Sequence, residues 1–414
     1  MTAAPKLIFA NTSPLIADDR GYDGCVVTDG DTILDITLDV PEDGVPIGCD
    51  SFVRGGGVLA PGIIDLGVFA VDRKACRAGG ITRVGLMPDQ SPVLGDPGIV
   101  RRAALMGKPD LWVHPLAAAT QGLAGKDLAE MAINAAAGAR AVATGRRWIS
   151  DSGVMRKVLA YARDCGLTVI AHAEDGGLTA NAVATEGETA MRLGLPAAPG
   201  IAEALAIARD IALAEETGAR LHFRQVTTSQ GFTLIRAAKD RGLPVTCGIT
   251  PAHLLLSDID ISDFRTFAHL SPPLRSEADR QAALLALSDG TIDVLSSGHD
   301  PRGPEEKRLP FADSEPGMSG AETLFALGMT LVHNRTIDLY KLFELLARNP
   351  ARILGIDAGE IAPGKAADLI LIDPDAPWQI AGAAMLARAG NTPFEGLPVQ
   401  GKVAKLWKGG REIA

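Results

Sequence analysis

The chain has 414 residues, of which 47% are hydrophobic and 22% charged, and this composition fits a protein that folds around a large buried core. A formal net charge of −10 argues against nucleic acid or an anionic membrane surface as the main partner, because either would favour a basic face. No apolar stretch reaches bilayer length and the five cysteines form no C-x-x-C pair, so we expect a cytoplasmic protein with no membrane partner.

The first predicted elements are short alternating strands within residues 1–58. Asp-Gly turns separate these strands and begin at positions 23, 29 and 43. Two more strand patterns come near the end of the chain, at residues 366–373 and 401–413. We therefore expect residues 1–58 and 358–414 to pair into one small β-sandwich domain.

The intervening residues, 59–357, repeat one pattern: an apolar or β-branched run, a turn, and an amphipathic segment with helical period. The predicted strands are 62–70, 81–88, 111–118, 139–145, 167–173, 220–228, 244–250 and 292–298, and the clearest helices are 155–166, 202–218, 231–242 and 276–290. These units predict a parallel (β/α)₈ TIM barrel. A doubly wound open sheet is the alternative, and it is less favoured because no glycine-rich phosphate loop opens the first helix.

Specific motifs are spread along nearly the whole chain, namely NTPFEG at 391–396 and the stretch that runs from PPLR at 272 to GHDP at 301, while NPARILG at 349–355 and GKAADL at 364–369 are more widespread. Together these motifs resemble the dihydroorotase branch of the amidohydrolase superfamily. The resemblance implies a barrel with zinc at the carboxyl ends of its strands. It also implies that metal-activated water hydrolyses the dihydroorotate ring, with an aspartate of the last strand as general base.

Most metal-site positions of that family carry other residues in this chain. The first strand of such enzymes ends in D-L-H-x-H, and here Gly67 and Phe69 stand in place of the two histidines. Arg146 stands where a carboxylate bridges the metals, Gln225 replaces a histidine of the sixth strand, and Gly298 replaces the aspartate of the eighth. We expect Phe69 to plug the space left by the missing imidazoles and metal.

The retained ligand position is His172, in the run AHAED. Catalytic zinc normally needs three protein ligands and a water, so we expect no cofactor, and zinc only if the protein is active with displaced ligands. For that case His299 and Asp300, at the end of the eighth strand, are the catalytic candidates. Adjacent strand residues point to opposite faces, so at most one of these two faces the barrel mouth.

Arginine side chains suggest two further roles for the barrel mouth. A guanidinium of Arg146 or Arg147 is expected to fill the emptied metal site and to satisfy Asp65. Arg73, Arg146 and Arg302 are candidate anion-binding residues if the mouth holds a small molecule.

The resemblance leaves two main hypotheses for function. The first is a non-catalytic, dihydroorotase-like pseudoenzyme of pyrimidine biosynthesis that acts as a scaffold for aspartate transcarbamoylase, and that is itself a homo-oligomer. The second is a zinc-dependent dihydroorotase or a related cyclic amidohydrolase that uses displaced ligands. A third possibility is a small-molecule binding protein. Bound metal and turnover would distinguish the second hypothesis from the others.

Overall fold

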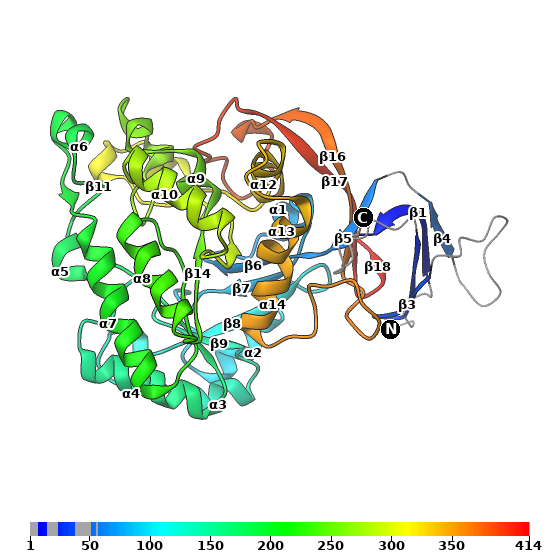
Figure 1. Ribbon diagram of the computed structural model, residues 1–414, viewed down its shortest axis with the longest axis horizontal. Helices are drawn as coiled ribbons and strands as arrows, with labels where there is room; N and C mark the ends of the chain where they lie inside the picture. The colour runs from blue at the N-terminus through cyan, green and yellow to red at the C-terminus, as the bar shows by residue number, and fades with distance from the viewer. Residues whose placement is uncertain (1–6, 15–23, 38–50, 55–56, 414) are drawn as a thin grey trace.

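The computed structural model describes residues 7–14, 24–37, 51–54 and 57–413. A helix-ringed body forms most of the molecule, and a smaller sheet lies at one side of it, on the right in Figure 1. This sheet has the strand order β18-β17-β16-β5-β1-β2-β3, with β4 beside β1. Its strands are β1 (Leu7–Pro14), β2 (Gly24–Asp29), β3 (Thr32–Thr37), β4 (Ser51–Arg54), β5 (Val58–Pro61), β16 (Leu369–Gln379), β17 (Pro398–Lys408) and β18 (Arg411–Glu412).

The terminal sheet joins segments from both ends of the chain. Strand β5 pairs antiparallel with β16, so that Ala60 lies opposite Ile370. On one face of the sheet the rings of Phe9 and Trp407 meet edge to face at 4.8 Å. The predicted turn at position 29 is present, since Gly30 has a φ of +65° between β2 and β3. The Asp-Gly sequence at 43 lies outside the described residues.

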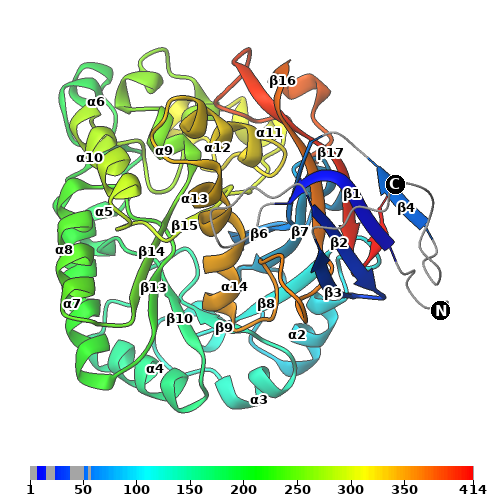
Figure 2. The same ribbon diagram turned by 45° about the vertical axis from the view of Figure 1, so that its right-hand side comes forward.

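Eight parallel strands form the barrel, which confirms the fold predicted from the sequence. Each barrel strand after the first pairs with the barrel strand that precedes it in the chain (Figure 2). In a doubly wound sheet the strand order would instead reverse part-way through the sheet. The strands are β6 (Ile63–Val68), β7 (Ile81–Leu86), β8 (Trp112–Ala118), β9 (Ala141–Ala143), β10 (Thr168–Ala171), β13 (Leu221–Phe223), β14 (Val245–Ile249) and β15 (Val294–Leu295).

Hydrogen bonds beyond the end of β15 link the last barrel strand to the first. The backbone N–H and the hydroxyl of Ser297 both donate to the carboxylate of Asp65, the N–H at 2.9 Å. The N–H of Phe69 donates to the carbonyl of His299 at 3.0 Å. Asp65 is fully buried, and burial raises the pKa of its carboxyl to about 6 although both Ser297 bonds act to lower it.

The helices surround the barrel strands. They are α1 (Arg73–Ala78), α2 (Pro97–Ala104), α3 (Met131–Ala136), α4 (Ser152–Asp164), α7 (Ile201–Thr217), α8 (Ser229–Asp240), α10 (Glu277–Ser288), α12 (Leu324–His333), α13 (Leu339–Phe343) and α14 (Asn349–Leu354), with a π-helical turn at Glu344–Arg348. Shorter elements lie in the loops: α5 (Gly176–Thr179), α6 (Glu188–Leu193), α9 (Pro251–Leu255), α11 (Pro304–Lys307), the strand pair β11 (Ala184–Thr185) and β12 (Ala197–Ala198), and 3₁₀ turns at Gln121–Leu123, Asp258–Ile261, Thr266–Ala268, Phe311–Asp313 and Gly382–Ala384.

Capping residues explain where several of these helices begin. The side chain of Asp151 accepts the N–H of Val154 at 2.8 Å and starts α4. Ser276 accepts the N–H of Asp279 in the same way at the start of α10. Glycines with positive φ, Gly242 and Gly290, follow the ends of α8 and α10.

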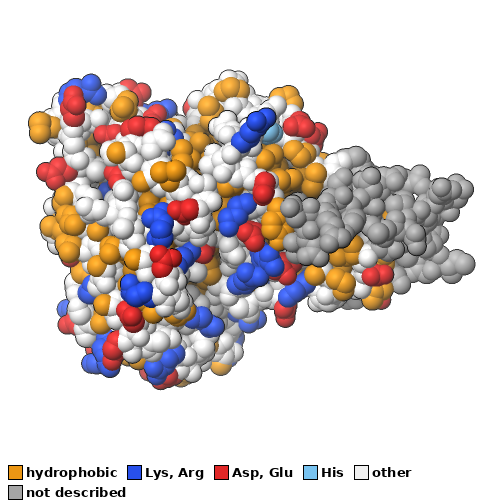
Figure 3. All heavy atoms as spheres, in the orientation of Figure 1, with side chains coloured by type: hydrophobic (Ala, Val, Ile, Leu, Met, Phe, Trp, Pro, Cys, Tyr) orange, Lys and Arg blue, Asp and Glu red, His pale blue; other side chains and the backbone are white. Residues whose placement is uncertain are grey.

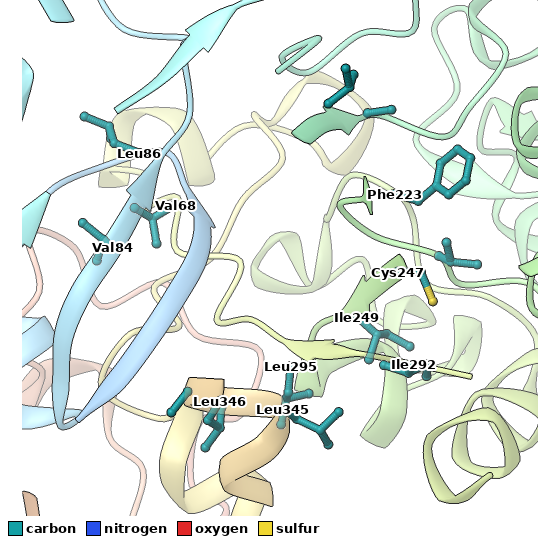
Figure 4. Packing of buried hydrophobic residues seen from close by; sticks show 14 of the residues in the cluster. Val68, Val84, Leu86, Phe223, Cys247, Ile249, Ile292, Leu295, Leu345 and Leu346 are labelled. Atoms are coloured by element: carbon teal, nitrogen blue, oxygen red, sulfur yellow. The ribbon is translucent and has the colours of Figure 1, made fainter. Parts of the chain in front are cut away.

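Apolar side chains between the strands and the helices form the main core. Figure 4 shows part of this core, including Phe223 of β13 and Cys247 and Ile249 of β14. In the same view, Leu345 and Leu346 of the π-helical turn pack near Leu295. Every residue of β6 is buried, as expected for a strand covered on both faces. Within the part of the chain that the structure describes, no helix is long and apolar enough to cross a bilayer. Acidic and basic side chains are interspersed on the face drawn in Figure 3.

Candidate functional site

A small cavity lies at the barrel mouth, where the carboxyl ends of the strands meet. Its lining includes Phe69, Arg146, Arg224, Gln225, Gly298 and Asp300. The structure therefore brings together five of the positions that the sequence singled out, Phe69, Arg146, Gln225, Gly298 and Asp300. The cavity volume is about 30 Å³, whereas sites for small organic ligands usually measure roughly 300–1,000 Å³. The mouth is thus largely filled by side chains.

Arg224, which follows β13, fills the space beside Gly67. A Cβ atom at position 67 would lie 3.2 Å from Cδ and 3.3 Å from Cγ of Arg224, and Gly67 has a φ of +94°. The stem of Arg224 thus lies where a side chain at position 67 would project. Sequence reasoning missed this residue. The available signal was its place directly before Gln225, a position that the family resemblance assigns to a metal ligand.

The guanidinium of Arg146 lies over the ring of Phe69, 3.7 Å from the ring centroid. Its Nη1 atom lies 2.7 Å from Oδ2 of Asp300, and Nη2 of Arg302 lies 3.0 Å from the same oxygen. The expected bond between an arginine and Asp65 does not form, because Ser297 supplies the partners of that carboxylate. Phe69 and the guanidinium of Arg146 therefore stack on each other at the mouth, and Asp300 links Arg146 to Arg302.

Asp89 approaches the mouth from the loop after β7. Its Oδ1 atom accepts the backbone N–H of Arg146 at 3.0 Å, while Oδ2 is buried without a hydrogen-bond partner in the described residues. A Cβ atom at Gly145 would lie 2.9 Å from Oδ1 of Asp89, and the φ of Gly145 is +81°. Glycine at 145 thus allows the carboxylate to reach the backbone of Arg146.

Gln225 takes part in a structural hydrogen-bond network with His253. Nε2 of the amide lies 2.9 Å from Nδ1 of His253, and Nε2 of that ring lies 3.0 Å from the carbonyl of Pro272. Burial lowers the pKa of His253 to about 4, so the ring is neutral at pH 7. A neutral ring that donates to Pro272 accepts at Nδ1, which suits the donor amide of Gln225.

His172, the retained ligand position, belongs to a buried ion network beside the mouth. Its Nε2 atom lies 3.5 Å from Oε2 of Glu174, and Oε1 of Glu174 accepts Nη2 of Arg275 at 2.6 Å. Burial opposes ionisation of Glu174, but the hydrogen bond from His172 and the charge of Arg275 hold its pKa at about 2. Arg275 also lies 3.6 Å from Glu203. His172 is therefore held by a carboxylate and does not line the cavity.

The two catalytic candidates of the eighth strand face different surroundings. Asp300 lines the cavity, whereas His299 is fully buried and does not line it. Nδ1 of His299 accepts the N–H of Ala321 at 3.4 Å, and its Nε2 atom has no partner among the described residues. Burial lowers the pKa of this ring to about 4. His299 is thus sealed away from any substrate at the mouth.

The other positions named from the sequence lie as follows. Gly298 has a φ of +62° and lines the cavity. Arg302 does not line the cavity itself but bonds to two residues that do, Asp300 and the carbonyl of Pro316. Arg73, one of the anion-binding candidates, instead pairs with Asp110 at 3.3 Å and is half exposed. Its guanidinium also donates to the carbonyl of Lys108, so this arginine does not line the cavity.

Comparison with known proteins identifies the family. The family model described as "Amidohydrolase family" matches residues 113–413. The chain belongs to the amidohydrolase family. Similar relatives include a "Dihydroorotase-like protein" of Pseudomonas aeruginosa, 37% identical, with 84% of this chain and 85% of that protein covered. A "Dihydroorotase" of Desulforapulum autotrophicum is 36% identical, with 92% of each chain covered.

Solved structures of the same fold include a hydantoinase and a dihydropyrimidinase. An L-hydantoinase from Arthrobacter aurescens matches with a TM-score of 0.86 and 22% identity, with 99% of this chain and 96% of that chain covered. A dihydropyrimidinase from Brevibacillus agri matches with a TM-score of 0.83 and 22% identity, with 99% and 95% covered. At this identity the likeness concerns the amidohydrolase fold alone.

Members of the amidohydrolase family are typically metal-dependent, and the residues at this mouth do not fit a catalytic zinc. Zinc in such sites takes three nitrogen, sulfur or oxygen ligands from the protein. The described residues contain no group of three His, Cys, Asp or Glu placed to hold a metal ion. The mouth instead presents the guanidinium groups of Arg146 and Arg224, which repel a divalent cation.

Proposed function

We propose that this amidohydrolase-family protein is a dihydroorotase-like component of pyrimidine biosynthesis that does not hydrolyse the dihydroorotate ring. The observation that carries the proposal is the stem of Arg224, which lies against Gly67 in the place of a metal-binding side chain. Hydrolysis in this family uses a metal-activated water. The mouth supplies neither the donor atoms nor the volume for a metal with its substrate.

We propose further that the protein is a scaffold for aspartate transcarbamoylase, the role that its resemblance to non-catalytic dihydroorotase-like subunits implies. Two relatives at 37% and 36% identity carry the name "Dihydroorotase-like protein". The barrel core is also well packed, with every residue of β6 buried, although the mouth has lost its ligands. An intact fold around an eroded site favours a function of the surface over a function of the site.

The scaffold role is tested by mixing the full-length protein with aspartate transcarbamoylase of the same organism. Size-exclusion chromatography with light scattering should show one complex of fixed stoichiometry, and the free protein should run as a homo-oligomer. Separate elution of the two proteins at micromolar concentration would contradict the scaffold role.

The loss of hydrolysis is tested by elemental analysis and by an assay of dihydroorotate ring opening. Protein expressed untagged in zinc-supplemented medium should contain almost no zinc and should show no turnover above buffer. A catalytic dihydroorotase relative, prepared in parallel, is the positive control. A content of about one zinc ion per chain together with turnover would favour the alternative, a dihydroorotase or cyclic amidohydrolase with displaced ligands.

A further inference from the structure

Arg224 is a buried charge without an ion-pair partner among the described residues. Only 6% of its surface is exposed, and its one hydrogen bond runs from Nη1 to Oε1 of Gln225 at 3.3 Å. Its Nε atom is buried and has no partner in the described part of the chain. Burial, followed by the charge of Arg146, lowers the pKa of Arg224 to about 10, so the group remains charged at pH 7. A charge buried in this way requires compensation.

The carboxylates of Asp89, Asp300 and Glu174 act on Arg224 without forming an ion pair with it among the described residues. The guanidinium carbons of Arg146 and Arg224 lie 3.7 and 5.1 Å from the centroid of the Phe69 ring, so both cations face one small region. One oxygen of Asp300 serves both Arg146 and Arg302. Asp89 bonds only to the backbone of Arg146. Arg302 has a second carboxylate partner, Glu306 at 3.1 Å. Arg224 is therefore the guanidinium of this group that no carboxylate contacts among the described residues.

The cavity beside these groups is small. Its volume of about 30 Å³ exceeds the roughly 10–15 Å³ that one buried water needs, so it has room for a small ion. Thr250 and Ser271 add hydroxyl groups to the lining, and hydroxyl groups donate hydrogen bonds to anions.

We propose that the barrel mouth binds one small monovalent inorganic anion of the size of chloride, held between Arg224 and Arg146. The site that the family resemblance assigns to a metal cation has, in this chain, the opposite charge preference. This inference is independent of the scaffold role, because it depends only on the residues of the mouth.

The first test measures thermal unfolding of the full-length protein at constant ionic strength, with gluconate replaced stepwise by chloride. Gluconate is too large for the cavity and serves as the reference anion. Chloride should raise the melting temperature by about 1–3 °C and the rise should saturate, because an anion that binds only the folded state stabilises it. An equal response to chloride and gluconate would overturn the proposal.

Two variants test whether the chloride-dependent rise in melting temperature arises at the barrel mouth. Arg224→Met keeps most of the aliphatic stem against Gly67 and removes the charge, so the chloride response should disappear. Arg236→Met, at an exposed arginine of α8, is the matched control and should keep the full response. A chloride response of equal size in Arg224→Met and in the parent protein would contradict the assignment.

A second measurement needs no variant and covers the case in which Arg224→Met fails to fold. Crystals of the parent protein grown or soaked in bromide should show one anomalous peak between the guanidinium groups of Arg146 and Arg224. Bromide absent from this position, with only water-level density there, would overturn the proposal.

Discussion

Two arginines are buried to similar depth at the top of the barrel, and their surroundings are opposite. Arg275 donates to Glu174 at 2.6 Å and to the hydroxyl groups of Thr227 and Thr185, with Glu203 nearby. Arg224 has a single weak bond to a neutral amide. The fold therefore does balance a buried guanidinium with its own carboxylates in one place. At the mouth, Arg224 is influenced by the charges of Asp89, Asp300 and Glu174 without a direct ion pair among the described residues, and the proposed anion would supply that direct partner.

The largest effect is expected for Arg275→Met, which removes the buried arginine whose charge is balanced by carboxylates. The change leaves the buried carboxylates of Glu174 and Glu203 without their cation. Removing one partner of a buried ion pair typically costs about 3–5 kcal/mol, and urea unfolding should show a loss of that order.

A double variant provides the control for this prediction. Glu174→Gln combined with Arg275→Met removes one stranded charge, and it should be less destabilised than Arg275→Met alone. A loss below about 1 kcal/mol in Arg275→Met would show that the network contributes little.

Asp65→Asn examines a third type of buried group, a carboxyl whose partners are neutral. Burial raises the pKa of Asp65 from 3.8 to about 6, so the folded state binds the proton more tightly than the unfolded chain. Stability contributed by this group is therefore full below about pH 4 and is lost as the pH rises to about 6. The amide of asparagine can keep both Ser297 contacts without any ionisation.

The variant should therefore gain stability relative to the parent between about pH 4 and pH 6. The gain should reach about 3 kcal/mol at most and then stay constant above that range. Urea unfolding at a series of pH values measures it. A difference that does not change with pH would show that the carboxyl of Asp65 titrates normally.

Asp300→Asn tests how much the carboxylate of Asp300 stabilises the arginines at the barrel mouth. The variant removes the charge that Arg146 and Arg302 share, which leaves Arg146 without an ion pair and Arg302 with Glu306 among the described residues. Charge-assisted hydrogen bonds are worth about 1.5–3 kcal/mol, and partial exposure of Arg146 reduces this, so we expect a loss of about 1–2 kcal/mol. Denaturant unfolding in gluconate buffer measures it. An unchanged stability would mean that Asp300 does not balance these arginines.

The smallest effect is expected for Arg236→Ala, which removes an exposed pair. Arg236 lies 2.6 Å from Asp289, and both side chains are 41% exposed. Solvent screens such pairs, so the free energy of unfolding should change by less than about 0.5 kcal/mol. A loss as large as that of Arg275→Met would mean that burial does not decide the value of an arginine pair in this protein.

Much of the fold could be predicted because it depends on local patterns. The eight apolar runs are covered on both faces, and residues such as Asp151 and Ser276 cap helices through bonds to backbone groups three residues ahead. The positions Phe69, Gln225 and Gly298, singled out as replaced metal ligands, could be placed at the barrel mouth because the pattern locates the strand ends on which they fall. These features need no knowledge of distant contacts.

The positions of the arginines could not be predicted in this way. The role of Arg224 depends on the absence of a side chain at Gly67, which is on another strand, and on the positive φ of that glycine. Asp65 bonds to Ser297 instead of an arginine because the barrel brings its first and last strands together. Such contacts follow from the three-dimensional closure of the barrel and leave no periodic signal in the sequence.

The pairing of β5 with β16 has a consequence for how the protein is made. Strand β5 leaves the ribosome before any barrel strand, and its partner β16 leaves after all of them. During synthesis the early strand therefore presents backbone groups that stay unpaired until the chain is nearly complete. A chain released before Leu369 would keep this open edge permanently, and such edges pair readily with other chains. The last part of the sequence thus protects the nascent protein against aggregation as well as completing its sheet.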